Sequence, residues 1–263
     1  MKSNRYFILI LFIISIVMLF AIKQTYAGGI SINLGDGSAG DISIDGGVAR
    51  SGNISIDGNV VNSGGTGCGN GIEGNGIDKT EKRSVSTFTS VEVDGAFNVY
   101  IECQKKNSIE VRGDSNILPY ITTKVKGNTL QITSNRTICP KKLLEIKVSA
   151  DNIERVSVSG AVDLSISGVN NKSLDIEADG AVDIKASGKT KNLKISVSGS
   201  GDVKAKELKA ENVDVSVNGA GDAVVYVSQK LKAEINGAGD ITYYGNPKEV
   251  IKDVSGAGDI IKR

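Results

Sequence analysis

The chain has 263 residues and a formal net charge of +1, and it contains no histidine and no tryptophan. This near balance of charges gives no electrostatic reason to expect a nucleic-acid partner. The lack of histidine removes the commonest general base and metal ligand, so catalytic and metal-binding motifs that require histidine are excluded. A chain of this length can hold one solenoid or two small domains.

Residues 1–27 have the pattern of a signal peptide. Lys2 and Arg5 precede an apolar stretch over residues 6–22, and a cleavage site can follow Ala27. Export to the periplasm, the cell surface or the medium is therefore expected. An uncleaved inner-membrane anchor is the alternative, because the apolar run is also close to the length of a membrane span. In either case the membrane would be touched only through residues 6–22.

Residues 28–83 are rich in glycine, asparagine and serine and contain a twelve-residue repeat. The segment Gly40–Gly46 recurs as Gly52–Gly58, each copy built around Ile-Ser-Ile. So few apolar residues can hardly offset the entropy of ordering, which favours a flexible spacer, with weak β structure as the alternative. The tract over residues 64–76 is the strongest candidate linker, and the folded domain is expected to cover residues 84–263.

From residue 84 the apolar residues become denser and alternate with polar ones. Segments such as Val99-Tyr100-Ile101 and Ile109-Glu110-Val111 predict strands. The segment 116–120 fits either one helical turn or a loop. Because terminal repeats must shield the end of a repeat core, we expect these irregular segments to cap the domain.

A tetrapeptide of the form Gly-small-X-Asp then returns six times. Successive copies start 20, 19, 20, 18 and 19 residues apart, which is the signature of a solenoid. The repeat glycines, expected at structural turns, are Gly160, Gly180, Gly199, Gly219, Gly237 and Gly256.

Alternating strands lie between these turns, as in Leu193-Lys194-Ile195-Ser196-Val197. Strict alternation places one side of each strand inward, and consecutive units can then pair only in parallel. The pattern predicts an all-β fold, a parallel β-helix with about 19–20 residues per coil. Glycine at each corner would supply a positive φ or allow a close approach of two backbones.

The aspartates that close the turns form one predicted column along the domain. Two interpretations are open: a calcium ladder, since hard cations bind several oxygens, or a cap in which each carboxylate accepts the N–H two residues further on. The period differs from that of known calcium-binding repeats, which favours the cap. The six residues are Asp163, Asp183, Asp202, Asp222, Asp240 and Asp259.

The three cysteines are Cys68, Cys103 and Cys139. Export permits disulfides, and the odd number leaves one thiol over. Because Cys103 and Cys139 fall in the patterned region and Cys68 falls in a glycine-rich tract, we predict a Cys103–Cys139 bridge with Cys68 free.

The chain resembles a family of domains of unknown function, the putative auto-transporter adhesin, head GIN domain. The resemblance rests on Phe88-Thr89-Ser90-Val91-Glu92-Val93-Asp94-Gly95, on the strands that follow, and on the serial Gly-Ala-Gly-Asp turns. It covers about residues 84–263. It implies a right-handed β-helix in exported bacterial proteins with an adhesion role, and it brings no catalytic residues or cofactor.

Three functions remain to be compared. Some parallel β-helices act on polysaccharides, but this chain has no convergent catalytic set and no nucleophile or phosphate-binding motif. A non-catalytic adhesion or binding domain is the expected function, with no cofactor and with a glycan or an envelope protein as partner. The third is an envelope scaffold that self-associates, for example through Ile260 and Ile261 in the last coil.

Overall fold

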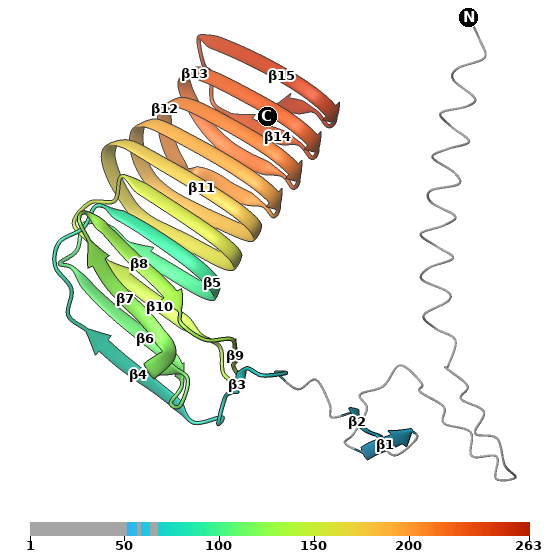
Figure 1. Ribbon diagram of the computed structural model, residues 1–263. Coiled ribbons are helices and arrows are strands. Elements are labelled where there is room, and N and C mark those ends of the chain that lie inside the picture. Colours follow the sequence, from blue (N-terminus) through green and yellow to red (C-terminus); the bar gives the residue numbers. More distant parts are fainter. Residues whose placement is uncertain (1–51, 57–58, 64–67) are drawn as a thin grey trace, which may run out of the picture. The chain divides into compact units, whose positions relative to one another are not determined.

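The computed structural model describes the backbone of residues 52–56 and 59–63 and all of residues 68–263 (Figure 1). The chain divides into two compact units, Met1–Gly67 and Cys68–Arg263. In the first unit β1 (Gly52–Ile56) and β2 (Asn59–Ser63) pair in antiparallel register. Part of the predicted spacer is therefore paired as strands. The predicted signal peptide lies outside the described residues.

The second unit is all-β. Over residues 68–263 its one helical element is a 3-10 turn, η1 (Leu118–Tyr120), so the segment 116–120 forms a helical turn. No helix in the described part of the chain is long and apolar enough to cross a bilayer. The strands are β3 (Ile72–Glu73), β4 (Asp78–Arg83), β5 (Ser90–Glu102), β6 (Ser108–Asp114), β7 (Ile121–Lys126), β8 (Thr129–Ser134), β9 (Ile138–Cys139), β10 (Glu145–Ser149), β11 (Arg155–Ser200), β12 (Val203–Ala220), β13 (Ala223–Ala238), β14 (Ile241–Tyr244), β15 (Glu249–Ala257) and β16 (Ile260–Lys262).

β5 and the passes of the chain from β11 onward lie one on another with their strands parallel, as the ribbons of Figure 1 show. Equivalent repeat positions are in register. Gly199 of β11 pairs with Gly219 of β12, which pairs with Gly237 of β13, which pairs with Gly256 of β15. The period of the sequence is thus the period of the stacking.

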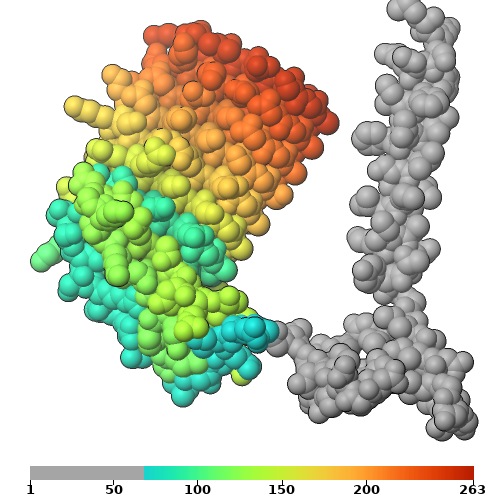
Figure 2. Space-filling model, in the orientation of Figure 1, coloured from blue at the N-terminus to red at the C-terminus, as the bar shows by residue number. Residues whose placement is uncertain are grey.

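The core is a set of apolar columns that run through the stack. In β12 the alternate residues Val213, Val215 and Val217 are each at most 3 % exposed. Their register partners in β13 are likewise buried, and the polar residues between them point outward. The predicted alternation is confirmed. In Figure 2 the described residues of this unit form one continuous body, coloured from cyan to red along the stacking direction.

The direction of pairing changes on the N-terminal side of the stack. There β10 pairs parallel with β5 on one edge and antiparallel with β6 on the other, and β6 pairs antiparallel with β4. Similarly, β8 pairs parallel with β5 and antiparallel with β7. The irregular segments that follow residue 84 therefore extend the stack with antiparallel strands, whose buried residues include Ile109, Val111 and Ile121.

The predicted start of the folded domain at residue 84 is wrong. The compact unit begins at Cys68, because β3 pairs with β9 and β4 pairs with β6. The sequence of β4, Asp-Lys-Thr-Glu-Lys-Arg, has no apolar residue and so no hydrophobic alternation. Such charged strands belong at the edges of sheets, where backbone pairing on one side holds them.

At the C-terminal end of the stack, a lysine occupies a position whose register partner in the preceding pass faces the core. Lys252 of β15 is in register with Ala233, which is 1 % exposed. The ammonium group lies 5.3 Å from the centre of the Tyr243 ring and donates a hydrogen bond of 2.6 Å to the carbonyl of Ile260. The aliphatic stem thus covers core residues, while the charge reaches polar and aromatic partners at the surface.

We predict that Gly219→Ala destabilises the domain far more than Gly127→Ala. Both glycines have a positive φ, +146° and +60°, so an alanine is strained at either position. A β-carbon at Gly219 would also overlap the carbonyl oxygen of Gly199, whereas nothing lies within 4 Å of one at Gly127. Urea denaturation should give losses of about 3 kcal/mol or more for Gly219→Ala and about 1 kcal/mol for Gly127→Ala. Equal losses would contradict the role assigned to the close backbone approach.

Candidate binding surface

Because like positions pair in parallel, the outward side chains also form columns. One face of the stack is formed by the strand segments that precede the repeat glycines, and we call it the face before the corner. On this face Lys194, Asp214 and Lys232 are register neighbours with alternating charge. Lys232 Nζ lies 3.6 Å from Asp214, and Arg155 lies 2.6 Å from Glu177 in the same part of the stack. Opposite charges on adjacent strands stabilise their pairing. Several charges on this face thus meet an opposite charge on an adjacent strand, and these pairs stabilise the stack.

The turn aspartates follow one another along the corner, as predicted, but they do not cap their own turns. The backbone N–H of Asp202 donates to Asp183 Oδ1 at 3.0 Å, and that of Asp240 donates to Asp222 Oδ1 at 2.8 Å. The same contact joins Asp222 to Asp202 and Asp259 to Asp240. Four of the six turn aspartates therefore accept a hydrogen bond from the next pass of the chain, and for these four the expected bond to an N–H two residues further on is wrong. The cause is the tight stacking at the corner, which brings the N–H of the next pass closest.

The structure gives the calcium ladder no support. Within the described residues, no group of three or more carboxylate, thiol or imidazole side chains is placed to hold a metal ion. One oxygen of each of four turn aspartates is already occupied by a backbone donor, which leaves a single oxygen for any ligand. The column acts as a set of hydrogen-bond acceptors between passes.

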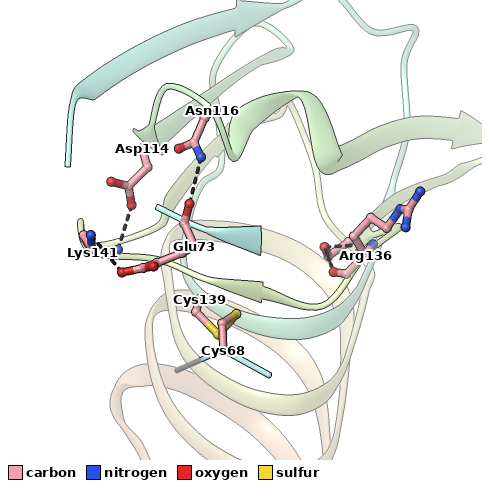
Figure 3. Close-up of a disulfide and its surroundings, with 8 residues drawn as sticks. Cys68, Glu73, Asp114, Asn116, Arg136, Cys139 and Lys141 are labelled. Atoms are coloured by element: carbon pink, nitrogen blue, oxygen red, sulfur yellow. Dashed lines mark hydrogen bonds and ion pairs between the residues drawn. A yellow bond between two sulfur atoms is a disulfide. The ribbon is translucent and has the colours of Figure 1, made fainter. Parts of the chain in front are cut away.

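The predicted Cys103–Cys139 disulfide is wrong. The structure pairs Cys68 with Cys139, with 5.6 Å between their Cα atoms and a sequence separation of 71 (Figure 3). Cys103 is buried and unpaired, and burial raises the pKa of its thiol to about 11. Sequence pattern placed Cys68 in a linker, whereas it begins the folded unit beside the short pair of β3 and β9.

A buried carboxylate lies close to this disulfide (Figure 3). Asp114 is fully buried, and it accepts hydrogen bonds from the backbone N–H groups of Gly76, Lys141 and Lys142 at 2.6–2.9 Å. Burial alone would raise the pKa of Asp114, but the three donors outweigh burial and the pKa is lowered. The ionised carboxylate thus holds together the chain around Gly76 and the segment that follows Cys139.

A second face is formed by the strand segments that follow the turn aspartates, and this face carries a groove. A hollow of about 290 Å³ lies where β5, β11 and β12 adjoin, and Tyr100 lines it. A second hollow of about 440 Å³, over β6, β10 and β5, shares Tyr100. A third, of about 270 Å³, shares Ser165, Lys185 and Lys204 with the first. We call these three adjoining hollows the Tyr100 groove.

The Tyr100 groove contains three of the predicted turn aspartates, Asp163, Asp183 and Asp202. The other three lie further along the corner column and do not line it. Tyr100, Lys185 and Lys204 were not singled out as site residues from the sequence. The sequence signal that could have pointed to this groove is Tyr100, an aromatic residue at an outward position between the inward residues Val99 and Ile101.

Most of the charged groups on the second hollow have partners. Glu102 accepts a hydrogen bond of 2.6 Å from Lys105, which is the main cause of its lowered pKa. Glu145 lies 3.2 Å from Arg112, and Glu110 lies 3.2 Å from Lys82. Each of these three carboxylates thus lies against a cation, and the lowered pKa of Glu102 makes it a poor general acid.

These observations define an all-β repeat domain with an open polar groove on one face. The sequence pattern of the family described as "putative auto-transporter adhesin, head GIN domain" matches residues 87–247, and the chain belongs to this family. No curated protein matches the chain.

One solved structure shares this fold at low sequence identity, and two others are less similar in structure. A putative adhesin from Bacteroides fragilis has a TM-score of 0.61 and 22 % identity, over 73 % of this chain and 100 % of that one. A putative adhesin from Parabacteroides merdae has a TM-score of 0.48 and 21 % identity, over 73 % of this chain and 98 % of that one. A protein from Parabacteroides distasonis titled as a putative lipid binding protein has a TM-score of 0.46 and 23 % identity, over 73 % and 99 % of the two chains.

We predict that thiol labelling distinguishes the two disulfide pairings. The folded protein should react slowly, because Cys103 is buried and the raised pKa keeps its thiol protonated. In denaturant without reductant, peptide mapping should find the label on Cys103 alone. Label on Cys68 would contradict the Cys68–Cys139 pairing. Reduction should cost about 4 kcal/mol of stability, as the loop-entropy model gives for a loop of this length.

We predict that Asp114→Asn lowers the free energy of unfolding at pH 7 by about 1–3 kcal/mol, because three buried donors lose a charged acceptor. The pKa of Asp114 is lowered in the folded state. Its contribution is therefore present above the ordinary aspartate pKa of about 3.9 and is lost as the pH falls through the folded value.

The difference between wild type and Asp114→Asn should accordingly shrink in thermal melts as the pH is lowered from about 4 to about 2. Asp94→Asn is the matched control, since Asp94 is exposed on the outward side of β5. A difference that stays constant down to pH 2 would contradict the role given to the charge of Asp114.

Proposed function

We propose that this chain is an exported envelope or cell-surface protein whose repeat domain is a non-catalytic binding domain of the adhesin type. The observation that carries the proposal is the family match over residues 87–247. The signal-like pattern of residues 1–27 supports export, and so does the Cys68–Cys139 disulfide, since disulfides persist in oxidising compartments.

We further infer that the domain is a right-handed parallel β-helix. Parallel register between equivalent positions 18–20 residues apart supports the helical path of the chain, for example in Asn218 with Asn236 and Ser200 with Ala220. The right hand follows from the family resemblance. In this proposal cleavage removes residues 1–27, and residues 28–67 connect the domain to its site of display.

A polysaccharide-acting enzyme is the alternative. Glycosidases need a carboxylic acid that keeps its proton beside an ionised carboxylate. In the Tyr100 groove the pKa of Glu102 is lowered, and Glu110 and Glu145 lie in ion pairs. At these three carboxylates the nearby cations support binding over turnover.

Self-association as an envelope scaffold is a second candidate. β15 and β16 carry the exposed apolar residues Val250, Ile251, Val254 and Ile261, which are 37–44 % exposed. Among the described strands, β15 pairs only with β13 and β16 only with β14. Unpaired strand edges with apolar side chains favour association of copies. A monomer at all concentrations in light scattering would remove this candidate.

We predict that cell fractionation finds the chain in the envelope or the medium, without residues 1–27. Limited proteolysis should leave a core that begins near Cys68, because the compact unit begins there. The mature protein should adhere to cell-wall or host-cell preparations without releasing sugars from a panel of polysaccharides. A cytoplasmic chain that retains residues 1–27 would contradict export, and release of sugars would contradict the non-catalytic assignment.

A further inference from the structure

Several charged side chains of the Tyr100 groove have no ion-pair partner among the described residues, so they are open to a ligand. We propose that the groove binds an extended chain of neutral sugars that lies across the strands. The inference rests on the proposed function, because it names the chemical class of the partner that the binding domain takes and the face that takes it.

The shape of the groove fits a linear ligand. The three hollows share residues, so they form one path from β6 over β10 and β5 to two passes of β11 and then β12. Six strands at their usual spacing extend over about 24 Å. The sugar units of a polysaccharide repeat at a distance close to the strand spacing. One chain can therefore place a unit over each successive pass.

The charge of the groove fits a neutral ligand. Asp163 and Asp183 have no cation within 4 Å among the described side chains, and Lys147 and Lys185 have no carboxylate within that distance. Asp183 uses one oxygen for the N–H of Asp202 and keeps the other. A polyanion would be repelled by the carboxylates of the groove, and a polycation would leave the ammonium groups of Lys147 and Lys185 without an acceptor. Sugar hydroxyls can donate to the carboxylates and accept from the ammonium groups at the same time.

Tyr100 provides the apolar contact that sugars require. Its side chain is 38 % exposed, and its register neighbours are Lys147 on β10 and Ser165 on β11. Ser165 is small, so the hollow opens beside Tyr100 and extends to Lys185. An exposed phenol ring offers a rigid apolar surface to the C–H side of a pyranose and costs little conformational entropy on binding.

The experiment measures binding of the full mature chain to neutral oligosaccharides of glucose, mannose and xylose by isothermal titration calorimetry. Polygalacturonate and chitosan serve as anionic and cationic probes. Tyr100→Ala should weaken binding at least tenfold, and Tyr100→Phe should retain it. Ser165→Tyr should also abolish binding, because a large side chain fills the hollow from an outward position that does not affect the core.

Tyr226→Ala is the matched control. Tyr226 is a partly exposed tyrosine whose ring lies 4.1 Å from Lys209 Nζ and lines none of the three hollows. Loss of neutral-glycan binding in Tyr100→Ala and Ser165→Tyr, with binding retained in Tyr226→Ala, is the expected result. Circular dichroism and melting temperature should be the same for all four variants, which separates loss of the site from loss of the fold.

Two results would overturn this inference and leave the proposed function standing. In the first, the wild type binds neutral glycans but the Tyr100 and Ser165 variants bind equally well. In the second, the wild type binds only a charged probe, or adheres to cells whose glycans have been oxidised with periodate. Release of sugars from a bound oligosaccharide would instead overturn the proposed non-catalytic function.

Discussion

The structure depends on the contact of one backbone with the next at the glycine corners. At Gly219 and its equivalents the carbonyl of the previous pass occupies the space of a β-carbon. Only residues without a side chain allow the passes to approach so closely, and this approach sets the register of the strands on both sides of the corner. Every column of the stack, inside and outside, follows from that register.

Parallel register places like positions side by side, which is favourable for apolar residues and costly for charges. The core uses the first effect, with Val, Ile, Leu and Ala repeated from pass to pass. The outer faces avoid the stacking of like charges in several ways. Lys194, Asp214 and Lys232 alternate in sign, and Asn236 donates to Asn218 at 2.9 Å. Each of four turn aspartates accepts a backbone N–H from the next pass, so one oxygen faces a partial positive charge as well as its acidic neighbours.

The periodic features of the fold could be predicted from the sequence. The structure differs from the prediction in the segments that have no sequence period. Turn spacing and alternation were sufficient to predict parallel pairing, the inward residues and the glycine corners. They could not predict β4, which is all polar and held by backbone pairing, nor the partner of Cys139, which depends on a fold around Cys68 with no apolar pattern. The Asp183 contact was also missed, because its partner is 19 residues away.

The same reasoning explains why the proposed recognition site lies on the early passes. Where consecutive passes are alike, an outward column is either paired within itself or uniform along its length. A distinct constellation can arise only where consecutive passes differ. The column through Lys147, Tyr100, Ser165 and Lys185 changes size and charge at nearly every step, and it ends on β10, where parallel pairing with β5 gives way to antiparallel pairing with β6. Departures from a local rule tend to mark functional sites. In a fold built on repetition, the irregular coils can therefore carry the specificity while the regular coils supply the rigid support.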